Sequence, residues 1–168
     1  MGVCKMSKVN ENLMAAFAGE SQANRKYLAF AAQAEKEGKT NAARLFKAAA
    51  EAETIHAMRE FKMAGNVNST EENLKAAIEG ESYETESMYP EFKANAEEAN
   101  DAKAAKFFDE VGQVEGIHAK LYQEVLDNIG SDSEIEFYLC PVCGNIETSK
   151  VDKCPVCNAA TWDKFIKF

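Results

Sequence analysis

An internal repeat constrains the fold of this chain more than any other feature of its sequence. The tripeptide GES at residues 19–21 recurs at residues 80–82, and the segment AETIHA at residues 52–57 recurs as VEGIHA at residues 114–119. The spacing of about 61 residues is too long for a solenoid repeat and suits a duplicated pair of helices. The sequence therefore predicts two similar helical hairpins in succession.

The periodicity of apolar residues agrees with the repeat. Apolar residues recur at spacings of three and four through four segments before residue 130, as they do along the buried face of a helix. Residues that end or cap helices separate these segments: Gly38, Gly65-Asn66, Ser69 with Glu72, and Asn100 or Asp101. Pro90 falls inside the third segment and is expected to kink it. Four amphipathic helices with short connections predict a mainly α fold built on a four-helix bundle.

Acidic and imidazole side chains interrupt the apolar faces of these helices. Seven of them fall there: Glu20, Glu53, His56, Glu81, Glu84, Glu115 and His118. Buried carboxylates without a counter-charge are costly and repel one another, whereas two divalent cations would offset most of the charge. One glutamate from each of two helices, with a Glu-x-x-His pair from each of the other two, is the donor pattern of carboxylate-bridged di-iron bundles. Oxygen-rich sites with one histidine per metal suit iron or manganese.

The alternative for a single Glu-x-x-His pair is a solvated pair on a helix surface. In this chain the only two histidines both follow a glutamate by three residues, and both pairs lie on an apolar face, so the sequence favours a dinuclear site. The two halves differ at one position. Glu84 follows Glu81 by three residues, whereas Ala23 holds the equivalent place after Glu20. One metal is therefore expected to face an additional carboxylate.

The C-terminal tail has a different composition from the helical part. Beyond a short polar linker at residues 130–133, β-branched and aromatic residues replace alanine, which predicts a bundle domain at residues 1–133 and a small domain at residues 134–168. Two CPVC units supply four thiols: Cys140, Cys143, Cys154 and Cys157. Four thiolates at this spacing predict a tetrahedral site for structural zinc or for one redox-active iron. Iron is favoured because a di-metal site that changes oxidation state needs single electrons, and zinc remains the alternative.

Charge and hydropathy exclude two classes of partner. The formal net charge is −9, and the sequence shows no basic patch of the kind that binds nucleic acid or an anionic membrane. No run of 18 apolar residues occurs, so no membrane-spanning segment is expected. Paired thiols in a reducing compartment hold a metal more often than they form disulfides. A cytoplasmic protein is expected.

Together these motifs resemble those of the rubrerythrin family, over nearly the whole chain. The matching segments are GES with Glu20, EAETIHA with Glu53 and His56, GESYE with Glu81 and Glu84, MYPEF with Tyr89, VEGIHA with Glu115 and His118, and both CPVC units. Asn145 and Asn158 stand where the family often has tyrosine and glycine, which bears on hydrogen bonding around the sulfurs. The resemblance implies a ferritin-like di-iron four-helix bundle followed by a rubredoxin-like Fe(Cys)4 domain.

The resemblance also implies a role for individual residues. The implied roles are bridging ligands for Glu53 and Glu115, terminal ligands for Glu20 and Glu81, exchange at one iron for His56 and Glu84, and hydrogen bonding to carboxylates for Tyr27 and Tyr89. The implied activity is reduction of hydrogen peroxide to water, as protection against oxidative stress. Electrons would come from NAD(P)H through a separate rubredoxin-type reductase.

Assembly and two alternative functions complete the expectations. Efficient electron transfer requires the two metal centres to be close, so we expect a homodimer in which each tail serves the bundle of a partner. The main alternative function is iron handling, as a ferroxidase of the ferritin-like type. A second alternative is a structural zinc-binding adaptor with an inert bundle.

Overall fold

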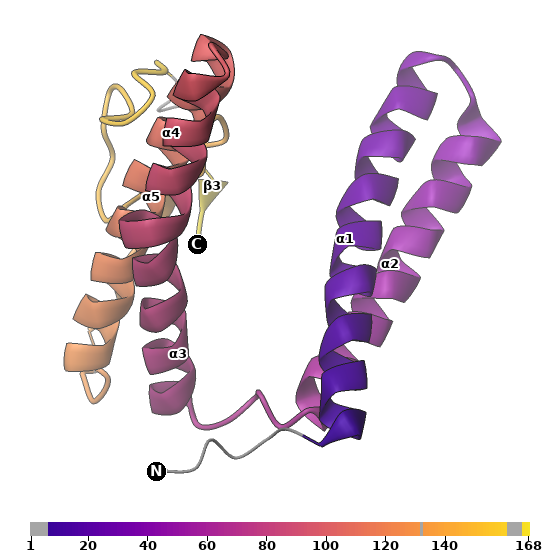
Figure 1. Cartoon of the computed structure of the whole chain (residues 1–168). Coiled ribbons are helices and arrows are strands. Elements are labelled where there is room, and N and C mark those ends of the chain that lie inside the picture. The colour runs from indigo at the N-terminus through magenta and orange to yellow at the C-terminus, as the bar shows by residue number, and fades with distance from the viewer. Residues whose placement is uncertain (1–6, 132, 161–165) are drawn as a thin grey trace. The chain divides into compact units, whose positions relative to one another are not determined.

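The structure is a computed structural model of the chain, and it describes residues 7–131, 133–160 and 166–168. Two compact units make up the chain, Met1–Asn68 and Ser69–Phe168, and Figure 1 labels their main helices. The chain is mainly α-helical with one small sheet near the C-terminus, as predicted. None of the helices in the described residues combines the length and the apolar composition needed to cross a membrane.

The first unit is a hairpin of α1 (Lys8–Lys36) and α2 (Thr40–Met63). Its two helices approach closely because the buried residues between them are small. Five of these residues are alanines and one is polar: Ala31, Ala34, Ala43, Ala50, Ala57 and Asn24. Asn24 Nδ2 donates to the carbonyl oxygen of Ala50 at 2.7 Å and to Thr54 Oγ1 at 2.8 Å. Gly38 has a φ of 69°, which confirms the predicted end of the first helix.

The second unit begins with a helical segment in three parts. These are α3 (Thr70–Tyr83), the π-helical segment η1 (Glu84–Met88) and α4 (Tyr89–Glu98), and they pack against α5 (Ala102–Asp127). The capping box predicted at Ser69 and Glu72 is present at the start of α3. Of the two residues predicted to cap α5, Asp101 does so by accepting a hydrogen bond from the backbone N–H of Ala104 at 2.9 Å.

The π-helical segment lies directly before Pro90, where the sequence predicted a kink. Pro90 has no backbone N–H to give to the preceding turn, and the N–H of Tyr89 bonds to the carbonyl oxygen of Glu84. Thr85 Oγ1 donates to the carbonyl oxygen of Gly112 on α5 at 2.6 Å. A Cβ on Gly112 would lie only 3.0 Å from Tyr89 Cβ, so a glycine is needed where the π-helical segment meets α5.

The tail forms a three-stranded antiparallel sheet. Its strands are β1 (Tyr138–Leu139), β2 (Ile146–Glu147) and β3 (Ile166–Lys167), in the order β2-β1-β3. Leu139 pairs with Ile146 on one side and with Ile166 on the other. β2 contacts α5, and an apolar cavity of about 270 Å³ lies between the tail and the helices, lined by residues that include Leu121 and Phe137.

The tail therefore lies against α5 of its own chain, within the Ser69–Phe168 unit. The sequence analysis expected it to reach the bundle of a partner. The tail can contact α5 of the same chain because the linker after Asp127, the last residue of α5, only has to reverse the chain direction. The homodimer and the domain boundary at residue 133 stay predictions.

Candidate metal centres

The α1–α2 hairpin brings three of the predicted ligands together. Glu20 lies on α1, and Glu53 and His56 lie one turn apart on α2. His56 Nδ1 lies 2.9 Å from Glu53 Oε2 and 4.0 Å from Glu20 Oε1. One donor atom from each residue falls within 4.8 Å of the other two. We call Glu20, Glu53 and His56 the first ligand group.

The second unit holds a matching set on α3 and α5. His118 Nδ1 lies 2.8 Å from Glu115 Oε2 and 4.0 Å from Glu81 Oε1. The donor atoms again fall within 4.8 Å of one another. Glu81, Glu115 and His118 form the second ligand group. The near-identical distances in the two groups are the structural counterpart of the sequence repeat.

Carboxylates crowd one another in both ligand groups. Partial burial raises the pKa of Glu20, and the carboxylates of Glu53 and Glu60 raise it further. Burial likewise raises the pKa of Glu81, followed by its hydrogen bond to Glu115 and the charge of that residue. A single imidazole does not offset this repulsion, whereas a divalent cation would. The donors present in each group therefore fit one of the two metal ions predicted from the sequence.

Glu84 lies at the start of the π-helical segment, beside the second ligand group. Burial raises the pKa of Glu84, and the charge of Glu81 raises it further. Burial also raises the pKa of Tyr89, followed by the charges of Glu84, Glu115 and Glu81, so the phenol faces the same carboxylates. Single π-helical turns inside helices often mark functional sites. Ala23, the counterpart of Glu84, lies in α1, which is α-helical throughout.

The roles implied for the two tyrosines are not visible as hydrogen bonds. Among the residues that the structure describes, neither Tyr27 nor Tyr89 donates to a carboxylate, and the ring of Tyr27 lies 6.4 Å from that of Phe30 and 6.2 Å from that of Phe46. Hydrogen bonding to the site stays a prediction for both tyrosines.

The sequence analysis did not single out Glu60, which lies near the first ligand group. Glu60 follows His56 by four residues and so shares a helix face with it. Its Oε2 atom is buried without a hydrogen-bond partner in the described part of the chain, and its charge raises the pKa of Glu20. The spacing from His56 was the available signal, but burial of the carboxylate could be seen only in the structure.

The four cysteines of the tail converge on one point. The Sγ atoms of Cys140 and Cys157 lie 3.8 Å apart, and those of Cys143 and Cys154 lie 3.5 Å apart. These distances are far too long for a disulfide, at about 2.05 Å. They are close to the roughly 3.8 Å between sulfurs around a tetrahedral ion with metal–sulfur bonds of about 2.3 Å. The thiols therefore fit the predicted tetrathiolate site.

Backbone N–H groups surround these sulfurs. Burial raises the pKa of Cys143 and that of Cys157. For Cys140 burial acts in the same direction, but hydrogen bonds from the backbone at Cys143 and Val142 prevail and lower its pKa to about 7. Gly144 and Asn158 have φ values of 85° and 59°, the left-handed conformation predicted for the residue after each knuckle.

One hydrogen bond joins the tail to the second ligand group. His118 Nε2 lies 3.0 Å from the carbonyl oxygen of Gly144, the residue that follows Cys143. Because a carbonyl oxygen only accepts, Nε2 is the donor in this contact, and Nδ1 is the ring nitrogen that faces Glu115 and would bind a metal. Metal-binding histidines commonly have their second ring nitrogen fixed in this way.

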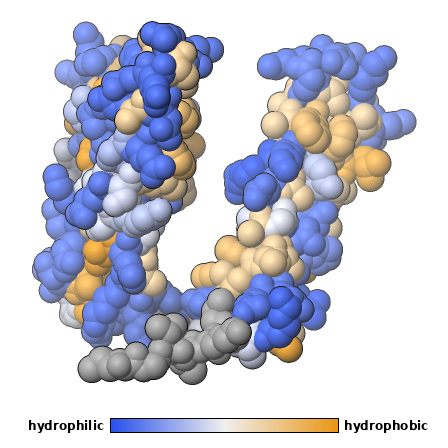
Figure 2. All heavy atoms as spheres, viewed as in Figure 1, coloured by the Kyte–Doolittle hydropathy of each residue, from blue (hydrophilic) through white to orange (hydrophobic). Residues whose placement is uncertain are grey.

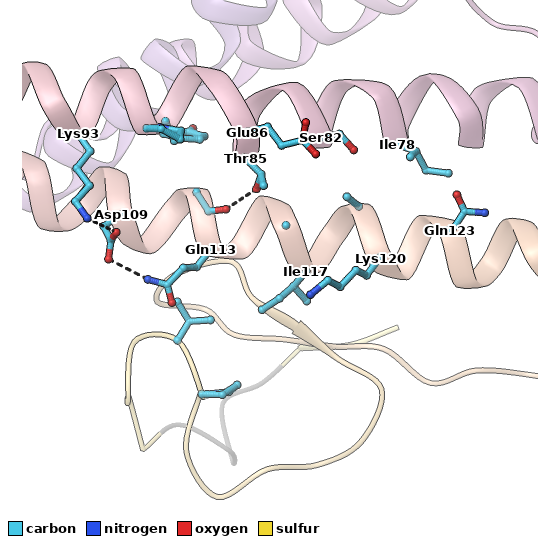
Figure 3. A pocket seen from close by; sticks show the side chains of 17 residues that line it. Ile78, Ser82, Thr85, Glu86, Lys93, Asp109, Gln113, Ile117, Lys120 and Gln123 are labelled. Carbon is cyan, nitrogen blue, oxygen red and sulfur yellow. Dashed lines mark hydrogen bonds and ion pairs between the residues drawn. The ribbon is translucent and has the colours of Figure 1, made fainter.

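The second unit also contains a groove of about 900 Å³ that includes none of the predicted metal ligands. Pro155 of the second knuckle is one of its lining residues, and Figure 3 shows the side chains that surround the groove. Lys93 is paired with Asp109 at 2.7 Å, and Asp109 accepts from Gln113 at 3.0 Å, as the dashed lines in Figure 3 show. Because the side chains of Lys93, Asp109 and Gln113 pair with one another, the two ligand groups and the four thiols are the candidate metal centres.

Comparisons with known proteins agree with this arrangement of donors. The sequence model of the family described as Rubrerythrin matches residues 11–126. The chain belongs to the rubrerythrin family. It is 37% identical over 162 residues to nigerythrin from Nitratidesulfovibrio vulgaris, covering 88% of this chain and 80% of that protein. It is also 37% identical over 173 residues to a rubrerythrin from Porphyromonas gingivalis, covering 91% of this chain and 86% of the relative.

Solved structures of nigerythrin are similar to the chain as well. Its fully reduced, all-ferrous state matches with a TM-score of 0.59 and 35% identity, over 98% of this chain and 88% of that one. Its mixed-valence state matches with a TM-score of 0.58 and 36% identity over the same shares. The ferritin-like and rubredoxin-like fold class is thereby confirmed, and the donor sets predicted for a di-iron pair and for a tetrathiolate ion are both present in the chain. Proteins of the rubrerythrin family are di-iron proteins of oxidative-stress defence and typically oxidoreductases that reduce peroxide.

Proposed function

We propose that this chain reduces hydrogen peroxide to water at a di-iron site held by both ligand groups. The observation that carries the proposal is that two groups of identical composition and near-identical geometry occur, with a tetrathiolate module hydrogen-bonded to one of them. Peroxide takes up two electrons and two protons, its O–O bond breaks, and two water molecules leave. When bound, the iron pair would supply the two electrons, one from each ion.

The carboxylates of the chain would hold the irons and the protons. Glu53 and Glu115 would be ligands shared by the two ions. Glu20 and Glu81 would each be a ligand of one ion. Glu84 and Tyr89 lie beside the second ligand group, and burial raises the pKa of each, so each group holds its proton more tightly than it would in water. They are positioned to hand a proton to an oxygen that leaves as water.

Glu84 and His56 are proposed to exchange at one iron. A ferrous ion accepts a neutral imidazole, whereas a ferric ion gains from one more anionic oxygen. Support comes from the surroundings of the two side chains. The π-helical backbone carries Glu84, and the side chain of His56 is 53% exposed, so neither is locked in a packed core.

Electrons are proposed to enter through the tail. Cys140, Cys143, Cys154 and Cys157 would hold the iron, which when bound would supply single-electron transfer from a separate NAD(P)H-dependent reductase of the rubredoxin type. The Gly144 carbonyl and His118 would connect this centre to the second ligand group. The proximity of Cys143, Gly144 and His118 supports this route. We also propose a cytoplasmic location, where such a reductase would be found.

Ferroxidase activity is the second candidate function. Carboxylate-rich helices of the ferritin-like type can oxidise ferrous iron, and the raised pKa of Glu20 and of Glu81 shows that both ligand groups favour added positive charge. Iron oxidation needs no built-in reductant, however. The tail therefore favours peroxide reduction.

Two replacements in the tail separate these functions. Cys143→Ser with Cys157→Ser removes the thiolate iron and leaves residues 7–131 intact. We expect NAD(P)H-driven peroxide reduction to fall by more than about 100-fold, while ferrous oxidation and the two bundle irons per chain persist. Optical spectra and metal analysis before and after one equivalent of peroxide provide the control. Unchanged peroxide turnover would refute the proposed electron route, and a wild-type protein that oxidises ferrous iron without reducing peroxide would favour the ferroxidase.

A further inference from the structure

One peptide group contacts both candidate metal sites of the second unit. The carbonyl oxygen of Gly144 accepts from His118 Nε2 at 3.0 Å. The N–H of the same peptide group belongs to Asn145, and it donates to the sulfur of Cys143. Because a peptide group is planar and its C–N bond is partly double, these two hydrogen bonds cannot reorient separately. The Gly144–Asn145 peptide therefore joins a predicted ligand of the bundle site to a predicted ligand of the tail site.

The second CPVC knuckle repeats the N–H···S bond without a histidine. There the N–H of Ala159 donates to the sulfur of Cys157, as that of Asn145 does to the sulfur of Cys143. The carbonyl oxygen before Ala159 belongs to Asn158, which is exposed and bonds to neither histidine within the described part of the chain. The connection to the bundle is therefore a property of the first knuckle alone.

The side chain of Asn145 is buried beside this peptide. Hydrophilic side chains cover much of the Ser69–Phe168 unit in the view of Figure 2, where water can bond to them. Asn145 is instead 0% exposed, and its Nδ2 donates to Glu147 Oε1 on β2 at 2.7 Å. An ionised carboxylate only accepts, so this contact decides which way the amide faces. The Oδ1 atom then has no hydrogen-bond partner among the described residues.

Packing does not account for a buried amide at this place. Burying a polar atom without a partner costs free energy, and a leucine of similar size would fill the space without that cost. What the amide provides is position. Its bond to Glu147 ties Asn145 to β2, and the backbone carbonyl oxygen of Asn145 accepts from the N–H of Cys140 at 2.7 Å. Side chain and backbone together therefore fix the orientation of the peptide group that precedes them.

We propose that Asn145 is a positioning residue. It holds the Gly144–Asn145 peptide in the orientation that transmits charge at His118 to the sulfur of Cys143. A cation at His118 Nδ1 makes Nε2–H a stronger donor, and a carbonyl oxygen in a stronger bond makes the N–H of its own peptide group a stronger donor in turn. The reduced tetrathiolate iron is more negative than the oxidised one, so a stronger N–H···S bond favours reduction.

The consequence is an energetic coupling between the two sites. A metal ion in the second ligand group raises the reduction potential of the tail iron, so that electrons enter the tail most readily when the bundle holds an ion that can receive them. The inference rests on the metal centres of the proposed function and adds to them the residue that couples one to the other.

The reduction potential of the tail iron tests the coupling. It is measured from the visible absorption of the full-length protein, first with iron in the tail alone and then with manganese(II) added to the bundle, because manganese prefers oxygen and nitrogen donors to thiolates. We expect loading to favour reduction by about tenfold in the wild type, which is about 59 mV for one electron. A wild-type potential that stays the same at full manganese loading would overturn the inference.

Three variants separate this coupling from direct attraction between the charges. Asn145→Leu and Glu147→Ala each remove the side-chain anchor and leave every metal ligand in place, so the gain on loading should fall from about tenfold to about twofold. Glu147→Gln removes the same negative charge as Glu147→Ala but keeps an acceptor for Asn145, so it should behave as the wild type. A full gain in either anchor variant, or a lost gain in Glu147→Gln, would overturn the inference. Glu147→Ala still tests it if the leucine variant does not fold.

Nuclear magnetic resonance of the zinc-substituted protein gives a second measurement. Zinc is diamagnetic, so the amide protons beside the sulfurs can be followed as zinc fills the bundle. The amide proton of Asn145 should move downfield because its hydrogen bond strengthens, and that of Ala159 should move much less. Equal movement of the two, or the same movement of Asn145 in Glu147→Ala, would contradict the proposed role. Neither measurement uses peroxide, so a coupled protein that fails to reduce peroxide would refute the proposed function alone.

Discussion

His118 donates from Nε2 to the carbonyl oxygen of Gly144 at 3.0 Å, and Gly144 directly follows the predicted thiolate ligand Cys143. His56, the counterpart of His118, has no partner for its Nε2 among the described residues, and its side chain is 53% exposed against 18% for His118. The imidazole of His118 is therefore held at both ring nitrogens, whereas that of His56 is held only at Nδ1, by Glu53. The proposed ligand exchange falls on the less constrained of the two.

Alanine at position 118 should loosen the tail. The lost hydrogen bond is worth about 0.5–1.5 kcal/mol, so amide exchange in residues 138–147 should accelerate about two- to tenfold. Hydrogen–deuterium exchange with mass spectrometry measures this. His56→Ala is the matched control, since it also removes a proposed ligand but does not touch the tail. Equal acceleration in both variants would mean that metal loss, and not the Gly144 contact, releases the tail.

Much of this organisation could be predicted from the sequence because it depends on local rules. The cap at Ser69, the left-handed Gly38 and the knuckles after Cys143 and Cys157 follow from neighbouring residues. Within each ligand group the glutamate and histidine of the Glu-x-x-His pair share a helix face, and the repeat shows which residues of the two groups match. Such features depend on spacing within a few turns of one or two helices.

Other features depend on contacts that spacing does not reveal. The π-helical segment at Glu84–Met88 arises where Thr85 meets Gly112 of another helix. The position of the tail depends on an apolar surface that includes Leu121 and Phe137, and an argument from the distance needed for electron transfer could not reveal that surface. Pro90 inside the third helical segment predicted only a kink. The π-helical segment could not be predicted, because one residue inserted into the hydrogen-bonding pattern of a helix leaves no recognisable spacing in the sequence.

Removing the additional carboxylate should affect turnover and not binding. Glu84→Ala leaves both ligand groups intact, so two bundle irons per chain should remain. We expect peroxide reduction to slow by about 10- to 100-fold, as judged by steady-state kinetics with metal analysis. Glu86→Ala in the same π-helical segment is the control, because Glu86 is exposed and should not matter. Wild-type kinetics in Glu84→Ala would show that the proposed exchange is not needed.

The two glycines of α5 that face the π-helical segment should tolerate alanine unequally. At Gly112 the new Cβ would lie 3.0 Å from Tyr89 Cβ, which cannot rotate away, whereas at Gly116 the nearest atom, at 3.1 Å, is the hydroxyl of Thr85. Alanine gains about 1 kcal/mol in helix propensity at either position. We expect Gly112→Ala to lose about 1–2 kcal/mol net and Gly116→Ala to be near neutral in urea unfolding. The reverse order would show that the segment shifts as a unit.

The capping box should make stability depend on pH. Hydrogen bonds from Ser69 lower the pKa of Glu72 below its usual value of 4.5, so the folded state binds the proton less tightly than the unfolded state. Its contribution is complete above that value and is lost as the pH falls through the folded pKa. Glu72→Gln should be less stable than wild type at pH 7, and the difference should shrink as the pH falls below the usual pKa of a glutamate. Glu71→Gln, in the same turn, serves as control, and a pH-independent difference would contradict the assignment.

Neutralising Glu60 should stabilise the protein without metal. Its buried Oε2 has no hydrogen-bond partner in the described residues, and its charge acts on Glu20, so Glu60→Gln keeps the shape and removes repulsion. We expect the metal-free Tm to rise by about 2–4 °C, with a smaller gain on adding ferrous iron anaerobically, because less repulsion is left for the metal to offset. Glu51→Gln, exposed on the same helix, should change neither value. Identical Tm values for the two variants would mean that solvent screens the charge of Glu60 and that this charge does not act on the first ligand group.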